Sequence, residues 1–228
     1  MKGSDNKSRR GSQRLLQESV QHRPDLLLAC LRESGAIHHG ETVAWVSPLA
    51  EDGYKEYKDA EFVAKLGLTN QLNIPLVSFW PRSGPRWDAL GITSDGRPVL
   101  VEAKAHISEA ASPGSTAVAD QSIRLISSSL EKVRRHIAPR SSASWTDTFY
   151  QYTNRLAHQY FMRELNGIDS VLVFLNFLNA EEMNGPRTME EWHGAIKLMH
   201  VLLQIPDDLE KFAVYHAFLD ANLVPGAA

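Results

Sequence analysis

The sequence predicts an α/β domain, because strand-forming and helix-forming patterns alternate along the chain. A β-hairpin is expected over residues 86–106, where two apolar runs flank a short loop at 94–96. Two amphipathic helices follow, and residues 170–178 then form a continuous apolar run that is typical of a buried strand. The expected order is therefore helix, strands that include the hairpin, two helices and a further strand.

Length and charge limit the organisation of the chain. Its 228 residues suffice for one domain with a sizeable core, which we expect at 13–228 after a disordered polar tail at 1–12. The formal net charge of −3 means that contact with a polyanion would need a local basic face or a bound metal ion. One cysteine excludes an internal disulfide, and no apolar run approaches the roughly 20 residues that span a membrane. Cytoplasm is the default expectation, with no membrane partner.

The hairpin is expected to bring two carboxylates together. If Thr93 pairs with Arg97, counting outward places Asp88 directly opposite Glu102. Side chains alternate along a strand, so Glu102 and Lys104 share one face. Opposed residues have Cβ atoms roughly 5 Å apart, and like charges there destabilise a hairpin. A divalent cation bound between the two carboxylates would reverse that effect.

These residues carry a resemblance to a known family. Trp87-Asp88 followed by Glu102-Ala103-Lys104 resembles the PD-(D/E)XK signature of the restriction-endonuclease-like nucleases, although Trp87 stands where the signature often has Pro. The resemblance covers the two site strands and, more loosely, the element order over a core at about 54–178. It implies a mixed central sheet flanked by helices, here with an extra N-terminal helix and a C-terminal helical extension.

The same resemblance implies the roles of three residues. Asp88 and Glu102 would bind Mg²⁺, for which Mn²⁺ can substitute. Lys104 would position or activate the attacking water.

Before the hairpin, helical spacing covers residues 13–33 and is divided at Pro24, and a short strand is expected at 41–46. A second helix is expected from 51–53 to Leu66.

The apolar stripe of this second helix consists of Phe62, Val63 and Leu66, and helical spacing places Glu56 and Asp59 on the same covered face, with Glu61 opposite. A buried carboxylate is costly unless it is paired or bound to a metal ion. Members of the family that the chain resembles often place an acidic residue of the first core helix near the metal, so the resemblance makes Glu56, by its facing, our candidate for a third metal ligand and Asp59 the second choice. The alternative is that Asp59 caps the helix and Glu56 lies exposed.

Residues 72–80 are expected to form a strand that buries Ile74, Leu76, Val77 and Phe79. The Pro/Gly-rich turn that follows contains Arg82 and Arg86, which could hold substrate phosphates or belong to a rigid turn with no such role. For Trp87 we expect a core position.

Two helices are expected at 118–137 and from Thr146 or Asp147 to about Leu165. The second carries a polar stripe at intervals of three and four residues, consisting of Gln151, Asn154, Arg155 and His158. This stripe could hold a nucleic-acid backbone beside the metal, or it could be a solvated helix face. Later in the chain, Thr188 and Glu191 predict a capping box, and the last segment is expected to form either a closing helix or an edge strand.

The leading functional hypothesis is a Mg²⁺-dependent nuclease that hydrolyses phosphodiester bonds, with DNA expected in preference to RNA. A second hypothesis is a catalytically inactive member of the same fold that binds nucleic acid or a protein. A third is a metal-dependent hydrolase of small phosphoesters. The sequence leaves a homodimer open.

Overall fold

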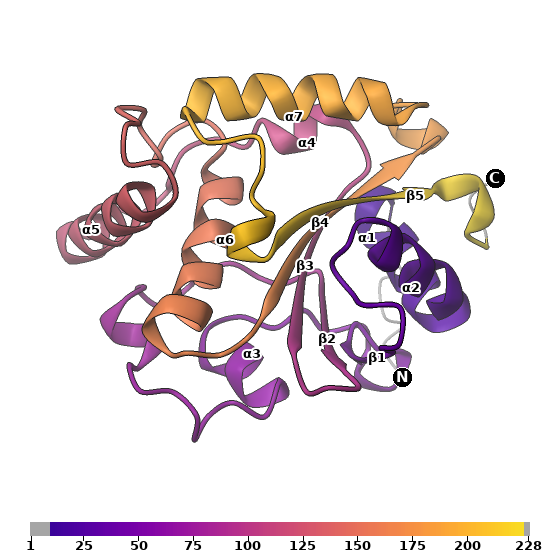
Figure 1. Ribbon diagram of the computed structural model, residues 1–228, viewed down its shortest axis with the longest axis horizontal. Helices are drawn as coiled ribbons and strands as arrows, with labels where there is room; N and C mark the ends of the chain where they lie inside the picture. Colours follow the sequence, from indigo (N-terminus) through magenta and orange to yellow (C-terminus); the bar gives the residue numbers. More distant parts are fainter. Residues whose placement is uncertain (1–9, 226–228) are drawn as a thin grey trace, which may run out of the picture.

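The computed structural model describes residues 10–225, which form an α/β protein with one open, mixed, five-stranded sheet (Figure 1). The strands follow one another across the sheet in chain order: β1 (Val43–Ser47), β2 (Ala89–Thr93), β3 (Pro98–Lys104), β4 (Val171–Leu178) and β5 (Val214–Asp220). The pairs β1/β2 and β2/β3 are antiparallel, whereas the pairs β3/β4 and β4/β5 are parallel. The central strand, β3, therefore joins the antiparallel and parallel halves.

The hairpin of β2 and β3 has the predicted register. Ala89 pairs with Val101, and the Thr93 N–H donates to the Arg97 carbonyl at 2.9 Å. One step outward from the Ala89 pair, Asp88 therefore lies beside Glu102. The predicted pairing of Thr93 with Arg97 is confirmed, and the paired register ends one residue short of Asp88 and Glu102.

Seven α-helices surround the sheet in the described part of the chain: α1 (Gly11–His22), α2 (Pro24–Glu33), α3 (Asp59–Lys65), α4 (Ile107–Ala110), α5 (Asp120–Ile137), α6 (Tyr150–Tyr160) and α7 (Met189–Leu203). One core packs α1 and α2 against the sheet face that carries Val99 and Val101. The other core packs α3, α5 and α6 against the face that carries Leu90 and Leu100. The two helix layers lie on opposite sides of the sheet in Figure 1.

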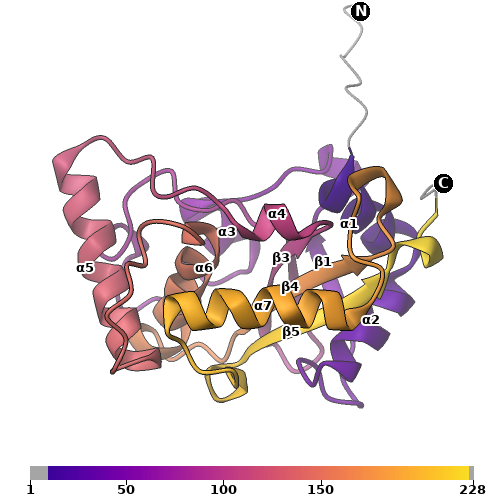
Figure 2. The ribbon, with the colours of Figure 1, turned by 90° about the horizontal axis from the view of Figure 1, so that it is seen from above.

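The last helix lies against the end of β4, and Figure 2 shows it on the outside of the molecule. The Trp192 indole N–H donates to the Phe177 carbonyl at 2.9 Å, and the predicted capping box of Thr188 and Glu191 is present. The chain then returns as β5, so the last segment is an edge strand parallel to β4. The sheet therefore extends beyond the expected core of 54–178 at both ends. None of the helices in residues 10–225 is long and apolar enough to cross a membrane.

Three sequence-based expectations about local structure were wrong. The helix expected from 51–53 begins only at Asp59: Ala50–Asp52 form a separate 3-10 turn that ends at Gly53, and Tyr57 then forms an isolated antiparallel bridge with Trp87. Phe62 is buried and Glu61 exposed as predicted, but Glu56 lies outside the helix, so the argument from helix facing does not apply to it. The expected tail at 1–12 is helical from Gly11, and its first nine residues lie outside the described part.

The expected strand at 72–80 is replaced by a short 3-10 turn at Leu76–Ser78. Leu76 and Phe79 are buried, whereas Ile74 and Val77 are exposed. Burial spaced by three residues is that of a helical turn, whereas a strand buries every second residue.

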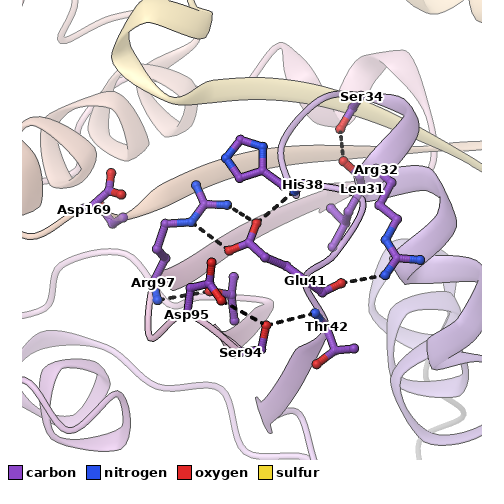
Figure 3. Close-up of polar contacts among 12 residues, drawn as sticks. Leu31, Arg32, Ser34, His38, Glu41, Thr42, Ser94, Asp95, Arg97 and Asp169 are labelled. Carbon is purple, nitrogen blue, oxygen red and sulfur yellow. Dashed lines mark hydrogen bonds and ion pairs between the residues drawn. The ribbon is translucent and has the colours of Figure 1, made fainter.

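A buried ion pair fastens the hairpin turn to the N-terminal helices (Figure 3). Glu41, whose side chain is 3% exposed, accepts two hydrogen bonds from the Arg97 guanidinium, from Nε at 3.1 Å and from Nη2 at 2.5 Å. The Glu41 carboxylate also accepts from the His38 N–H, and its main-chain carbonyl accepts from Arg32. Arg97 is the residue that closes the hairpin, so this cluster holds the register that brings Asp88 to Glu102.

We expect Glu41→Gln to lower the free energy of unfolding by about 3 kcal/mol at pH 7. The Arg97 hydrogen bonds hold the pKa of Glu41 at about 2, below its ordinary value. A depressed carboxyl pKa stabilises the folded state above the unfolded pKa of about 4.3, and this stabilisation is lost as the pH falls toward 2. The difference between variant and wild type, measured by urea unfolding, should therefore shrink by half or more at pH 3. Glu61→Gln, at an exposed position, is the matched control, and a pH-independent difference for Glu41→Gln would contradict the assignment.

Candidate active site

Asp88, Glu102 and Lys104 meet at the carboxyl end of β3. Glu102 lies on the central strand, and its side chain is only 4% exposed. Lys104 follows two residues later on the same face, and its Nζ donates to Glu102 Oε1 at 2.6 Å. The alternation of the strand therefore places an ammonium group directly against a buried carboxylate.

Asp88 reaches this group from a bend just before β2. The Trp87 N–H donates to the Tyr57 carbonyl at 3.0 Å, so the chain turns away from β3 before Asp88. The Ala103 N–H donates instead to Asp88 Oδ2, at 2.8 Å. This hydrogen bond holds the second carboxylate at the end of the hairpin.

Arg155 on α6 lies behind Glu102. Its Nε donates to Glu102 Oε2 at 2.7 Å, its Nη2 donates to the Arg86 carbonyl at 2.7 Å, and its guanidinium lies 4.9 Å from the centre of the Trp87 ring. The residue is 5% exposed. The sequence pattern predicts a substrate-binding role for Arg155, but its donors are directed at protein acceptors, so in the structure it is the buried counter-ion of Glu102.

The charges of the site do not balance evenly. Burial raises the pKa of Glu102, but the charges and hydrogen bonds of Arg155 and Lys104 outweigh it, so the pKa lies below the ordinary value and Glu102 is ionised. Burial, followed by the negative charge of Glu102, raises the pKa of Asp88 to about 8. Without a bound cation, Asp88 is therefore largely protonated at pH 7, whereas Glu102 is ionised.

A hard divalent cation at this site would replace the proton of Asp88 and would be held by both carboxyl groups. Mg²⁺ is usually held by one or two carboxylates, and its other positions are filled by water and phosphate oxygens. Among residues 10–225 there is no group of three or more His, Cys, Asp or Glu side chains that could hold a metal ion. Asp88 and Glu102 are the side chains that would hold the ion, and Glu102 Oε1 would be shared with Lys104.

Neither acidic residue that we considered as a third ligand has that role in the structure. Glu56 Oε1 accepts from Gln13 Nε2 at 2.6 Å, which ties α1 to the segment before α3. Asp59 accepts the N–H groups of Ser83 and Gly84, at 3.0 and 2.9 Å. Asp59 thus supports a loop beside the site, and it makes no cap for α3, whose N-cap is Lys58.

The site opens into a pocket of about 650 Å³ between two loops. One wall comes from residues 80–86 and the other from 108–116, while Asp88, Glu102, Lys104 and α6 form the floor. The second wall is anchored to the start of α6, because Ser112 Oγ accepts from the Gln151 N–H at 2.9 Å and the Ser112 carbonyl accepts from the Phe149 N–H at 3.1 Å. The hydrogen bonds at both walls give the pocket a defined shape.

The remaining predicted substrate-binding residues are divided between the pocket and its surroundings. Gln151 is exposed at the pocket, and its Oε1 accepts from Lys104 Nζ at 2.9 Å. Asn154 lines the pocket but is buried and accepts from Arg155 Nη1 at 2.9 Å. Arg86 is exposed and lines the pocket, whereas Arg82 is exposed in the same loop outside the lining. The alternative of a solvated α6 face was wrong, because Asn154, Arg155 and His158 are all buried.

Sequence reasoning missed two features of this site. The wall at 108–116 was visible only as a stretch of small residues, with no pattern that pointed to a pocket. The role of Asp59 depends on the loop at 83–84, which is 24 residues further along the chain.

No protein-family model matches this chain, and no curated protein and no solved structure matches it either. The residues and geometry of the site are therefore what point to a function for this chain.

Proposed function

We propose that this protein is a metal-dependent, nuclease-like hydrolase with a restriction-endonuclease-like core, which cleaves phosphodiester bonds of nucleic acid. One observation carries the proposal: two opposed carboxylates, Asp88 and Glu102, share a pocket with the Lys104 ammonium at the end of the central strand. The mixed sheet with β3 at its centre is consistent with such a core.

The residues have distinct tasks in this proposal. Asp88 and Glu102 would hold Mg²⁺, which would polarise the phosphate and lower the pKa of the attacking water. Lys104 Nζ, held by Glu102 and Gln151, orients that water and offsets charge on the phosphate in the transition state. Arg155 keeps Glu102 ionised and fixes its orientation. We propose DNA as the substrate in preference to RNA.

Specific observations also favour the two other functions. Lys104 already takes Glu102 Oε1, a metal-ligating oxygen in our proposal, as would be expected of an inactive protein that only binds nucleic acid or a partner. The pocket volume of about 650 Å³ falls in the range typical of small-molecule sites, which is compatible with a small phosphoester. Comparing the turnover of an oligonucleotide with that of bis(p-nitrophenyl) phosphate separates the three functions. A nuclease cleaves the oligonucleotide, a small-phosphoester hydrolase cleaves only the small substrate, and an inactive binding protein cleaves neither.

Metal binding is the direct test of the site. At 100 times its Kd, Mn²⁺ should add about 2.7 kcal/mol to the stability of the folded state, which corresponds to a rise in Tm of about 5–10 °C. Asp88→Asn should abolish most of this shift. The amide still offers an oxygen to the Ala103 N–H and replaces a carboxyl whose ionisation the folded protein disfavours, so without metal the variant should be as stable as wild type or more so.

Asp95→Asn, in the exposed hairpin loop, is the matched control and should keep the full metal shift. Equal shifts in wild type and Asp88→Asn would remove this pocket from consideration as the metal site.

A further inference from the structure

Three basic residues lie at or beside one wall of the pocket: Arg86 lines it, whereas Lys58 and Arg82 lie outside the lining next to residues that form it. Arg82 belongs to the same loop as Arg86. The bridge between Tyr57 and Trp87 is antiparallel, so Lys58 lies in register beside Arg86. Lys58 Nζ is also 3.5 Å from Ser83 Oγ, and Ser83 lines the pocket. We call these three residues the basic rim.

The charge of the basic rim is largely uncompensated. In the described range 10–225, the guanidinium groups of Arg82 and Arg86 make neither a hydrogen bond nor an ion pair. The carboxylate nearest to Lys58 is Asp59 at 3.9 Å, and Asp59 already accepts the N–H groups of Ser83 and Gly84. Like charges at neighbouring positions repel, so the rim would be stabilised by a bound anion.

The main chain beneath the rim is held in place. Asp59 fixes Ser83 and Gly84, and the buried Arg155 donates to the Arg86 carbonyl at 2.7 Å. Arg82 and Arg86 therefore project from a supported loop that leads directly to Asp88, two residues after Arg86. This arrangement suits repeated phosphates along a strand, one of which reaches the carboxylates.

The opposite wall has a different character. This wall has one charged residue that lines the pocket, Glu109. Its other lining residues are small or neutral: Ser108, Ala111, Ser112, Pro113, Gly114 and Thr116. Duplex DNA presents two charged strands, each of which needs cations for tight binding, whereas a single strand presents one. A pocket with cations on one wall alone matches one phosphate backbone.

We infer that the basic rim binds the phosphodiester backbone of a single nucleic-acid strand and leads it to the carboxylates. The inference rests on the proposed nuclease function and specifies its substrate as single-stranded or locally unpaired nucleic acid. Lys58 thereby becomes a substrate-binding residue together with Arg86 and Arg82.

The test measures binding by fluorescence anisotropy with the full chain in EDTA, so that no strand is cut. The probes are labelled dT12, rU12 and a 12-bp DNA duplex, each titrated at several salt concentrations. We expect both single strands to bind more tightly than the duplex, and the comparison of dT12 with rU12 shows which sugar is preferred. Arg86→Ala and Lys58→Ala should each weaken single-strand binding about 3- to 10-fold and reduce the slope of log K against log[salt] by about 0.7.

Arg124→Ala, an exposed cation on α5, is the matched control and should change neither value. Tighter binding of the duplex, equal behaviour of Arg86→Ala and Arg124→Ala, or no binding of either single strand would each overturn the inference. The Mn²⁺ shift in Tm is measured on the same variants. If Mn²⁺ still raises the Tm but single strands do not bind, the inference about the basic rim fails and the proposed metal site stands. If Mn²⁺ does not raise the Tm of the wild-type protein, the proposed function itself has failed.

Discussion

Lys104→Ala is expected to lower the rate of cleavage of a linear nucleic-acid strand by about 10²-fold or more, the range for losing a general base or a charge stabiliser. Lys104 Nζ is held between Glu102 Oε1 and Gln151 Oε1, at 2.6 and 2.9 Å, so the ammonium has a defined position at the carboxylates. The variant should keep the Mn²⁺-induced rise in Tm, because removing the ammonium frees Glu102 Oε1. Loss of cleavage with retention of metal binding would separate the chemical role of Lys104 from a structural one.

Lys132→Ala provides the control for this experiment, because Lys132 is an exposed lysine on α5 away from the pocket. It should cleave at the wild-type rate. If wild type cleaves and Lys104→Ala cleaves equally fast, the proposed mechanism is wrong.

Arg155→Met should have the largest effect on stability, a loss of about 3–5 kcal/mol in the free energy of unfolding. The substitution leaves Glu102 buried without its principal counter-ion and removes the hydrogen bond to the Arg86 carbonyl. It also removes the contact of the guanidinium with the Trp87 ring. Urea unfolding at pH 7 measures the loss.

The double variant Glu102→Gln with Arg155→Met distinguishes an ion-pair effect from lost packing. Removing both charges should recover much of the stability, because neither an uncompensated carboxylate nor an uncompensated guanidinium remains. Arg135→Met is the control, since Arg135 is 74% exposed and its ion pair with Glu131 should contribute at most about 1 kcal/mol. A double variant as unstable as the sum of its parts would show that Arg155 does not act through Glu102.

The hairpin could be predicted in detail because the residues that determine its register lie close together in the sequence. A three-residue loop that ends in Gly96 closes the hairpin between Thr93 and Arg97, and strand alternation then determines which residues oppose one another. Gly96 has a φ of +84°, the left-handed conformation that glycine adopts without strain. Asp88, Glu102 and Lys104 could therefore be brought together from the sequence alone.

The surroundings of the hairpin could not be predicted in the same way, because they depend on distant contacts. The segment just before α3 is held by the bridge from Tyr57 to Trp87, which is 30 residues later in the chain. The spacing of apolar residues in the helix gives no indication of this bridge. For Arg155, the polar spacing on α6 was visible, but the partner depends on how α6 packs against β3. The pattern alone is the same for a buried counter-ion and for a ligand of nucleic acid.

The separation of Glu102 from Arg155 along the chain has a consequence for the order of folding. The two strands of the hairpin are adjacent in sequence, whereas Arg155 is 53 residues from the carboxylate that it pairs with. A hairpin that closes by itself would oppose Asp88 and Glu102 with Lys104 as the only nearby cation, and local closure would work against charge repulsion. We therefore expect the acidic end of the hairpin to form last, after α6 has packed against the sheet and placed the Arg155 guanidinium beside Glu102. Completion of the pocket would then coincide with completion of the fold, so a partly folded chain would not present a working pair of carboxylates.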